Sequence, residues 1–363
     1  MKFLCNRAAL ASVMGTINSV VPARSTRPVL QNVHLRGNSD NTVTVSGTDL
    51  EIGMSINLAV EQLTEPQTVL VNSSLLTGII SEDTSEKVEF SVTADAARVQ
   101  TNRGKFEFAI SNEEFPEIKN IEDDNFITIK GRDLQDAVER TKFAVSRSDG
   151  KYTFNGICVN CQEDNVDFVA SDGNRLSVVT KKIVNQKKIA NIALVICKGM
   201  TELARLCGAD KEANIQFAGN EMIARVGDAR LVSRLLEGKF PQYRSVIPTE
   251  TSLKATVDRQ ELLNGLRLVS KLCSDEVRSV SIDAANNKMV LSLNGGGGGS
   301  GIYELEAVVE GGEISTAFNC AYFIDAVNAL KNNEVVLNLV QNNRPMLITE
   351  DDFIHVVTPV TKG

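Results

Sequence analysis

Apolar residues along this chain recur with two periods, one typical of helices and one typical of strands. Six segments carry apolar residues three and four apart, and several of them begin at a capping residue such as Asn72 or Asn319. Short alternating runs separated by turn residues lie between these segments and predict strands. We therefore expect six helices, over residues 6–21, 72–83, 130–146, 197–208, 258–273 and 319–333.

The order helix, strands, helix, strands occurs three times. After each second helix the pattern predicts a strand, a polar turn, a strand, a turn and a further strand, over residues 86–111, 213–236 and 333–359. Runs of antiparallel strands with two helices per unit are typical of the α+β class. We expect three similar domains, over residues 1–120, 121–250 and 251–363.

A Phe-Pro pair closes a predicted strand at Phe115-Pro116 and again at Phe240-Pro241. Proline cannot donate a hydrogen bond to a strand ladder and restricts the conformation of the residue before it. At each pair the chain must therefore leave the strand in an extended conformation. Thr358-Pro359 stands at the corresponding end of the third unit. The repeated exits support a triplicated unit, and we interpret the first as a structural hinge.

Composition limits the class of protein. The chain has 363 residues, a net charge of −8 and no apolar run of membrane-spanning length. The first residues lack the apolar core of a signal peptide, so we expect a cytoplasmic protein without membrane contact. The acidic balance argues against a tail-driven nucleic-acid binder but leaves room for one basic face.

Catalytic motifs are absent from the sequence. It has no phosphate-binding loop, no nucleophile elbow and only two histidines, so we expect no enzyme activity, no metal and no cofactor. We interpret the Cys158-x-x-Cys161 pair as structural, because residues three apart in a strand point to opposite faces. An alternative is a carboxylate enzyme around Asp49 and Asp172, although both recur in equivalent turns, which favours a structural role.

The polar faces of the predicted helices carry basic residues mixed with acidic ones, which is also typical of ordinary solvated helix surface. If all the helices face one side, these residues line a surface that meets a phosphate backbone without reading sequence.

Six segments together resemble the bacterial DNA polymerase III beta subunit family, the DNA sliding clamps: residues 1–3, 27–35, 47–54, 170–179, 237–248 and 327–339. The resemblance implies three similar clamp domains, each with two helices packed on antiparallel sheets. It also implies two chains, head to tail, in a ring with helices inside and sheets outside. Such a ring encircles duplex DNA without sequence preference and confers processivity on the replicative polymerase. The implied partners are the polymerase subunit, the clamp loader and other proteins with a clamp-binding motif.

The resemblance also assigns residues. DNA contacts would fall on Arg24, near Tyr152 and on Lys198, with a diffuse field from further helix residues, Arg7, Arg132, Arg140, Arg205 and Arg267. A partner-peptide pocket with Leu or Phe anchors would be lined by Thr153, Phe154, Ser171, Gly173, Asn174, Arg175, Leu176, Pro241, Ser245, Val246, Tyr322, Met346, Val356 and Thr358. The subunit interface would use Phe106, Phe108 and Leu272.

Two features depart from the family pattern. Thr358 stands where many members have methionine, and the run Gly295–Gly299 stands where many have acidic residues that support the interface. The glycine run is either a native loop or an engineered replacement, and in both cases we expect a weaker ring. These departures also leave open a specialised or accessory clamp with altered partner binding.

Overall fold

The structure, a computed structural model, describes residues 1–121, 124–147, 152–251, 253–274, 278–294, 299–339 and 344–360. Within them all six expected helices are present, each shorter than expected: α1 (Arg7–Ile17), α2 (Ser73–Glu82), α3 (Gly131–Glu139), α4 (Cys197–Cys207), α5 (Arg259–Ser270) and α6 (Cys320–Asn328).

Capping side chains fix where the helices begin. Asn72 Oδ1 accepts the Leu75 N–H at 3.0 Å before α2, and Asp258 Oδ1 accepts the Glu261 N–H at 2.8 Å before α5. The third helix ends early, because the Thr141 hydroxyl donates back to the Ala137 carbonyl and a 3-10 turn over residues 142–144 follows.

The chain divides into two compact units. The first holds residues 1–135, 183–189 and 198–235, and the second holds residues 136–182, 190–197 and 236–363. The middle third of the chain therefore contributes strands to both units.

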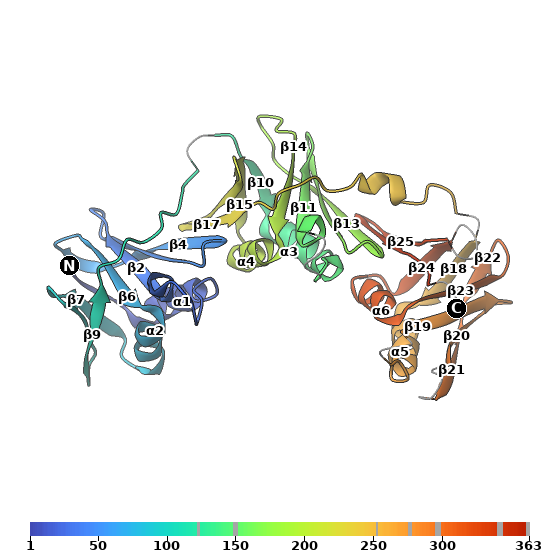
Figure 1. The fold of residues 1–363 in the computed structure, drawn as a ribbon, viewed down its shortest axis with the longest axis horizontal. Helices are drawn as coiled ribbons and strands as arrows, with labels where there is room; N and C mark the ends of the chain where they lie inside the picture. The colour runs from blue at the N-terminus through green and yellow to red at the C-terminus, as the bar shows by residue number, and fades with distance from the viewer. Residues whose placement is uncertain are drawn as a thin grey trace. The chain divides into compact units, whose positions relative to one another are not determined.

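The first unit contains one antiparallel sheet of thirteen strands (Figure 1). Along the sheet the strands are β10 (Ile127–Lys130), β15 (Glu212–Ala218), β16 (Glu221–Val226), β17 (Ala229–Arg234), β4 (Ile52–Ala59), β3 (Thr42–Thr48), β2 (Asn32–Gly37), β6 (Thr68–Asn72), β9 (Lys105–Ser111), β8 (Ala96–Gln100), β7 (Lys87–Val92), β1 (Lys2–Asn6) and β5 (Glu61–Thr64). Helices α1 and α2 lie side by side against β2, β3, β4 and β6, and bury Val33, Val45 and Met54.

The second unit contains two antiparallel sheets. The larger follows the order β14 (Asn191–Ile196), β11 (Gly156–Cys161), β12 (Asn165–Ser171), β13 (Arg175–Lys182), β26 (Phe353–Val357), β25 (Met346–Glu350), β24 (Glu334–Leu339), β18 (Leu253–Asp258) and β22 (Val308–Glu310). The smaller follows the order β21 (Ser300–Glu306), β20 (Lys288–Asn294), β19 (Ser279–Ala285) and β23 (Ile314–Asn319). Helices α5 and α6 pack against each other in this unit.

The expected three-stranded hairpins are confirmed as β7–β9, β15–β17 and β24–β26. At or just after the end of its last hairpin strand, each repeat pairs with the strand that precedes its own second helix. Backbone pairing marks the three crossings, which join Ser111 to Leu70, Leu236 to Leu194 and Pro359 to Phe318. The three repeats therefore share one strand connectivity.

Candidate functional site

The second unit contains a cavity of about 320 Å³ between the turn after β12, the end of β26 and the segment that follows Phe240. Its lining includes most of the residues that the family resemblance assigns to a peptide pocket: Phe154, Ser171, Gly173, Asn174, Arg175, Leu176, Pro241, Val246, Val356 and Thr358. Four further lining residues were missed from the sequence: Phe240, Gln242, Tyr243 and Pro345.

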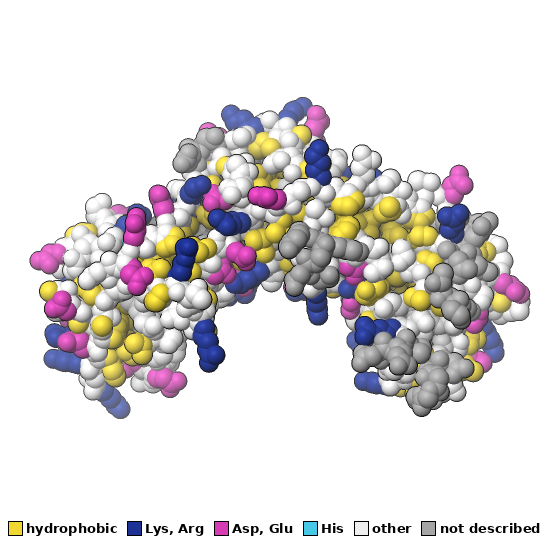
Figure 2. All heavy atoms as spheres, in the orientation of Figure 1, with side chains coloured by type: hydrophobic (Ala, Val, Ile, Leu, Met, Phe, Trp, Pro, Cys, Tyr) yellow, Lys and Arg dark blue, Asp and Glu magenta, His cyan; other side chains and the backbone are white. Residues whose placement is uncertain are grey.

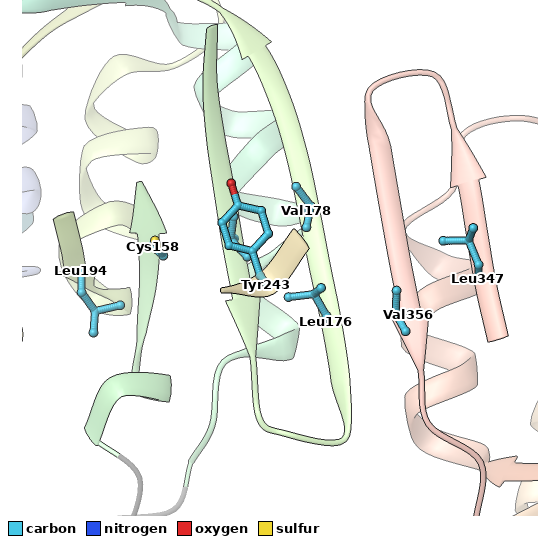
Figure 3. Packing of buried hydrophobic residues seen from close by; sticks show 8 residues of the cluster. Cys158, Leu176, Val178, Leu194, Tyr243, Leu347 and Val356 are labelled. Carbon is cyan, nitrogen blue, oxygen red and sulfur yellow. The ribbon is translucent and has the colours of Figure 1, made fainter. Parts of the chain in front are cut away.

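Leu176 and Val356 give this cavity an apolar floor, and both belong to a buried cluster (Figure 3). Leu176 on β13 stands directly opposite Val356 on β26, and Leu347 on β25 stands opposite Val356 on its other side. All three belong to one buried cluster with Tyr243. Val246 is 57% exposed at the rim and adds apolar surface open to solvent. A floor and rim of this kind accept aliphatic or aromatic anchors of an extended peptide.

A tight turn between β12 and β13 forms the polar edge of the cavity. The Asp172 carboxylate accepts the N–H groups of Asn174 (2.9 Å) and Arg175 (3.1 Å), and Gly173 has φ +91°. The left-handed conformation favours glycine, and the missing side chain lets another backbone approach. The Thr358 hydroxyl donates to the Asn174 carbonyl at 2.8 Å, which fixes the end of β26 against this turn.

Arg175 positions the elements behind the cavity. Its guanidinium donates to Asp172 Oδ2 (3.0 Å) and Asp325 Oδ2 (2.6 Å) and stacks on the Tyr322 ring at 4.2 Å. Its side chain is only 9% exposed. Arg175 therefore acts first as a structural link between β13 and α6.

Tyr243 fixes the wall that follows Phe240. Its hydroxyl donates to Asp167 Oδ2 (2.6 Å) and accepts from Asn160 Nδ2 (2.8 Å), and burial together with Asp167 raises the pKa of the phenol. Arg244 also pairs with the buried Asp167 carboxylate. These contacts hold the segment over residues 240–246 against β11 and β12.

Four of the expected pocket residues lie outside the lining. Met346 is fully buried on the opposite face of β25 from Leu347, because side chains alternate along a strand. Tyr322 lies beneath the Arg175 guanidinium, and Ser245 lines a neighbouring cavity with Ile192. Thr153 packs beside Gly238.

Apart from Tyr152, the residues that the resemblance assigns to DNA contact divide into an exposed group and a group that is buried or half-buried. Arg24, Arg132, Lys198, Arg205 and Arg267 are exposed. Lys198 pairs with Asp49 at 2.6 Å and Arg205 with Glu202 at 2.8 Å. Figure 2 shows Lys and Arg interspersed with Asp and Glu on the visible face. The side chain of Tyr152 lies outside the described residues.

Arg140 is not available to a phosphate, and this expectation from the sequence is wrong. Its side chain is 5% exposed and pairs with Glu350 (2.5 Å) and Asp352 (3.1 Å). Lys181 joins the same network through Asp136 at 2.5 Å. Arg7 is half-buried and donates to the Ile80 and Ser85 carbonyls, so its role is also structural.

Two of the residues assigned to the subunit interface lie on strand β9, and the third, Leu272, follows helix α5 and lies beside β21. Phe106 is 42% exposed and Phe108 is half-buried on β9. Leu272 is half-buried, and a Cβ at Gly301 on β21 would lie 2.6 Å from its Cδ1. Residues 295–298 of the glycine run lie outside the described residues.

The described residues give little support to an enzyme. Burial raises the thiol pKa of Cys158 and Cys161 to about 12, so both stay protonated. Asp49 accepts the N–H groups of Glu51 and Ile52, as Asp172 does for its own turn. Among the described side chains no group of three or more His, Cys, Asp or Glu is placed to hold a metal ion. No described helix is both long and apolar enough to cross a membrane.

Comparisons with known proteins agree over the full length. Residues 1–119, 128–242 and 244–360 match the N-terminal, central and C-terminal domains of the DNA polymerase III beta subunit family. The chain is 27% identical over 346 residues to the beta sliding clamp of Escherichia coli K12, covering 94% of each chain. It is 26% identical over 358 residues to that of Synechococcus elongatus, covering 96% of this chain and 95% of the relative. A crystal structure of the Pseudomonas aeruginosa sliding clamp bound to griselimycin has a TM-score of 0.95, 26% identity and full coverage of both chains.

Proposed function

The chain belongs to the DNA polymerase III beta subunit family, the sliding clamps, and from this membership we propose that it encircles duplex DNA and tethers the replicative polymerase. It acts without catalysis, in the cytoplasm, through a head-to-tail pair of chains. We place its domain boundaries near residues 120 and 250.

The observation that carries this proposal is the way the repeats join. The last hairpin strand of the middle repeat, β17, pairs with β4 of the first, and β26 of the third repeat pairs with β13 of the middle one. In the third repeat β21 corresponds to β4 and β13. Two junctions of one kind therefore exist within the chain.

Two strand edges remain for a third junction of the same kind. Among the described strands, β21 pairs only with β20, and β9 pairs along its length only with β8, with β6 joining at its last two residues. Both carry exposed apolar side chains, Ile302 at 72% and Phe106 at 42%. We infer that β9 of one copy pairs with β21 of another, which covers both edges and closes a ring.

The cavity over β13 and β26 supports the tethering role. Its apolar floor and its turn at Gly173 suit a short extended peptide with Leu or Phe anchors. The polymerase subunit and the clamp loader would both use it. Exposed basic side chains supply non-specific contacts to the DNA phosphates; these are Arg24, Arg132, Lys198, Arg205 and Arg267.

Retention on DNA tests the topological role. We expect the chain to stay on nicked circular DNA after loading and to leave the same DNA once it is linearised. Arg132→Glu should weaken retention on circles at raised salt, and Lys187→Glu, in the exposed turn between β13 and β14, should not. Equal retention on circular and linear DNA would contradict encirclement.

Sedimentation tests the assembly. We expect a dimer that dissociates at sub-micromolar concentration, because the glycine run replaces interface charge. A dimer that persists unchanged through that range would refute the weakened interface while leaving encirclement intact.

A further inference from the structure

A second cavity, of about 480 Å³, lies in the first unit and has no part in the function proposed above. Strands β2, β3, β4 and β17 form its floor, and the segment over residues 115–120 covers it. It differs from the peptide pocket in chemistry, because its floor is made of polar and basic side chains.

Strand register builds this floor. His34 stands opposite Ser46, Ser46 opposite Ser55 and Ser55 opposite Arg230, so one cross-strand row carries all four. Arg36, two residues beyond His34, is on the same face. The opposite face of these strands is apolar and holds buried residues such as Val45. The polar row is therefore specific to one face.

Several groups on this face have no hydrogen-bond or ion-pair partner among the residues that the structure describes. The Ser55 side chain is 3% exposed, and its hydroxyl oxygen makes no hydrogen bond within the described structure. Neither Arg36 nor Arg230 forms an ion pair with any described residue. Leaving a buried hydroxyl without a partner is destabilising, so such a group in a native site calls for an explanation.

The covering segment is fixed in place. Phe115 stacks on His34 with ring centroids 5.2 Å apart, and Lys119 pairs with Glu221 at 2.7 Å. A Cβ at Gly53 would lie 3.1 Å from Ile118. The cavity is therefore built by packed residues on both sides.

The charge balance inside favours an anion. Arg36 and Arg230 face the cavity with one carboxylate, Glu117, which is exposed on the covering segment. Burial and the Arg36 charge lower the pKa of Arg230, and burial and Arg36 also lower the pKa of His34. Arginine stays protonated in proteins, so two cations remain close together, and neither forms an ion pair with a described carboxylate.

We propose that this cavity binds a small molecule that carries a phosphate monoester, with Arg230 and Arg36 on the phosphate and the Ser55 hydroxyl as a further donor. Two guanidinium groups and a hydroxyl match the geometry of phosphate oxygens. The volume exceeds that of inorganic phosphate and lies within the roughly 300–1,000 Å³ range of small-molecule sites, which indicates a ligand of nucleoside-phosphate or sugar-phosphate size.

Calorimetric titration of the full chain at physiological salt tests this proposal. The probes are AMP, glucose 6-phosphate, inorganic phosphate and citrate. We expect one of the two esters to bind at least about tenfold tighter than inorganic phosphate and citrate. Which ester binds tighter identifies the ligand class. No binding of either ester, or citrate binding equally well, would overturn the proposal.

Variants locate the site. Arg230→Gln should weaken ester binding about tenfold or more, because it removes a charge-assisted contact. Arg103→Gln changes an exposed arginine in the turn between β8 and β9 and should leave binding unchanged. Without ligand, Arg230→Gln should not lower the melting temperature, since it removes an unpaired cation. Equal ester affinity in the two variants would overturn the assignment.

Discussion

Replacement of Arg140 by methionine tests whether this residue serves stability or DNA. The guanidinium pairs with Glu350 at 2.5 Å, and the two side chains are 5% and 4% exposed. Methionine keeps much of the volume and the contact with the Phe353 ring, over which the guanidinium lies at 4.3 Å. The substitution therefore removes mainly the charge and leaves the Glu350 carboxylate without its cation.

The expected loss follows from that burial. Breaking a buried ion pair by removing one partner costs about 3–5 kcal/mol. Glu350 also accepts the backbone N–H groups of Lys331 and Asn332 at 2.7–3.0 Å, which still solvate its charge. We therefore expect the lower end of that range, a loss of about 3 kcal/mol in the free energy of unfolding.

Urea unfolding followed by far-UV circular dichroism measures this loss, and the double variant Arg140→Met/Glu350→Gln is the control. The amide keeps the volume of Glu350 without its charge, so the double variant should recover part of the loss, with a coupling of about 0.5–3 kcal/mol. The reasoning is refuted if Arg140→Met unfolds within about 0.5 kcal/mol of the parent. A normally stable variant that loses retention on circular DNA would restore Arg140 as a DNA contact.

Three further changes test other parts of the molecule. Val246→Asp should weaken binding of a Leu/Phe-anchored peptide about tenfold or more in a fluorescence titration, whereas Val184→Asp, which changes an equally exposed valine (58% against 57%), should not. Phe106→Asp should shift sedimentation toward monomer, and an unchanged dimer would contradict the β9 edge as interface. Burial and Arg175 lower the pKa of His355 to about 3, below the value of about 6.5 for an unfolded chain. Below pH 6.5 the unfolded chain binds a proton at this imidazole, whereas the folded chain does not until about pH 3. The free energy of unfolding is therefore unaffected by this group above pH 6.5 and falls by about 1.4 kcal/mol per pH unit as the pH is lowered toward 3. His355→Gln should show a shallower decline between pH 6.5 and 5, and equal slopes would contradict this role.

Local signals in the sequence were enough to predict the helices and hairpins of the fold. Caps such as Asn72 and Asn319 and alternating strand patterns act within a few residues, so the helices and the three hairpins followed from them. The ends were less certain, because the Thr141 hydroxyl competes for a helix carbonyl in a way that periodicity does not show.

Side-chain roles that depend on distant partners were harder to predict. Arg140 looked like solvated helix surface, because its partner Glu350 stands 210 residues away. Met346 was assigned to the pocket, but its side chain is fully buried and lies outside the lining, because the alternation of side chains along β25 turns it into the core. Phe240 and Tyr243 were missed as pocket residues, although they belong to the segment already singled out for its Phe-Pro pair, and that signal would have sufficed to include them.

The sequence pattern also did not indicate a binding site at the polar row of His34, Ser46 and Ser55. Each residue reads as an outward position of an alternating strand, which needs no explanation. Only the pairing of β17 with β4 brings Arg230 into the same row. That pairing depends on a contact between repeats, which no local pattern encodes.

The junction between repeats also has a consequence for the chain on its own. If β9 of one copy pairs with β21 of another, as we infer, a single copy carries both halves of the interface and can add to a linear chain of copies as well as close a ring. Growth into a filament competes with closure whenever the concentration of free copies exceeds the effective concentration of the two ends of an opened pair. Any factor that opens the ring must therefore also shield these two edges until the ring closes again.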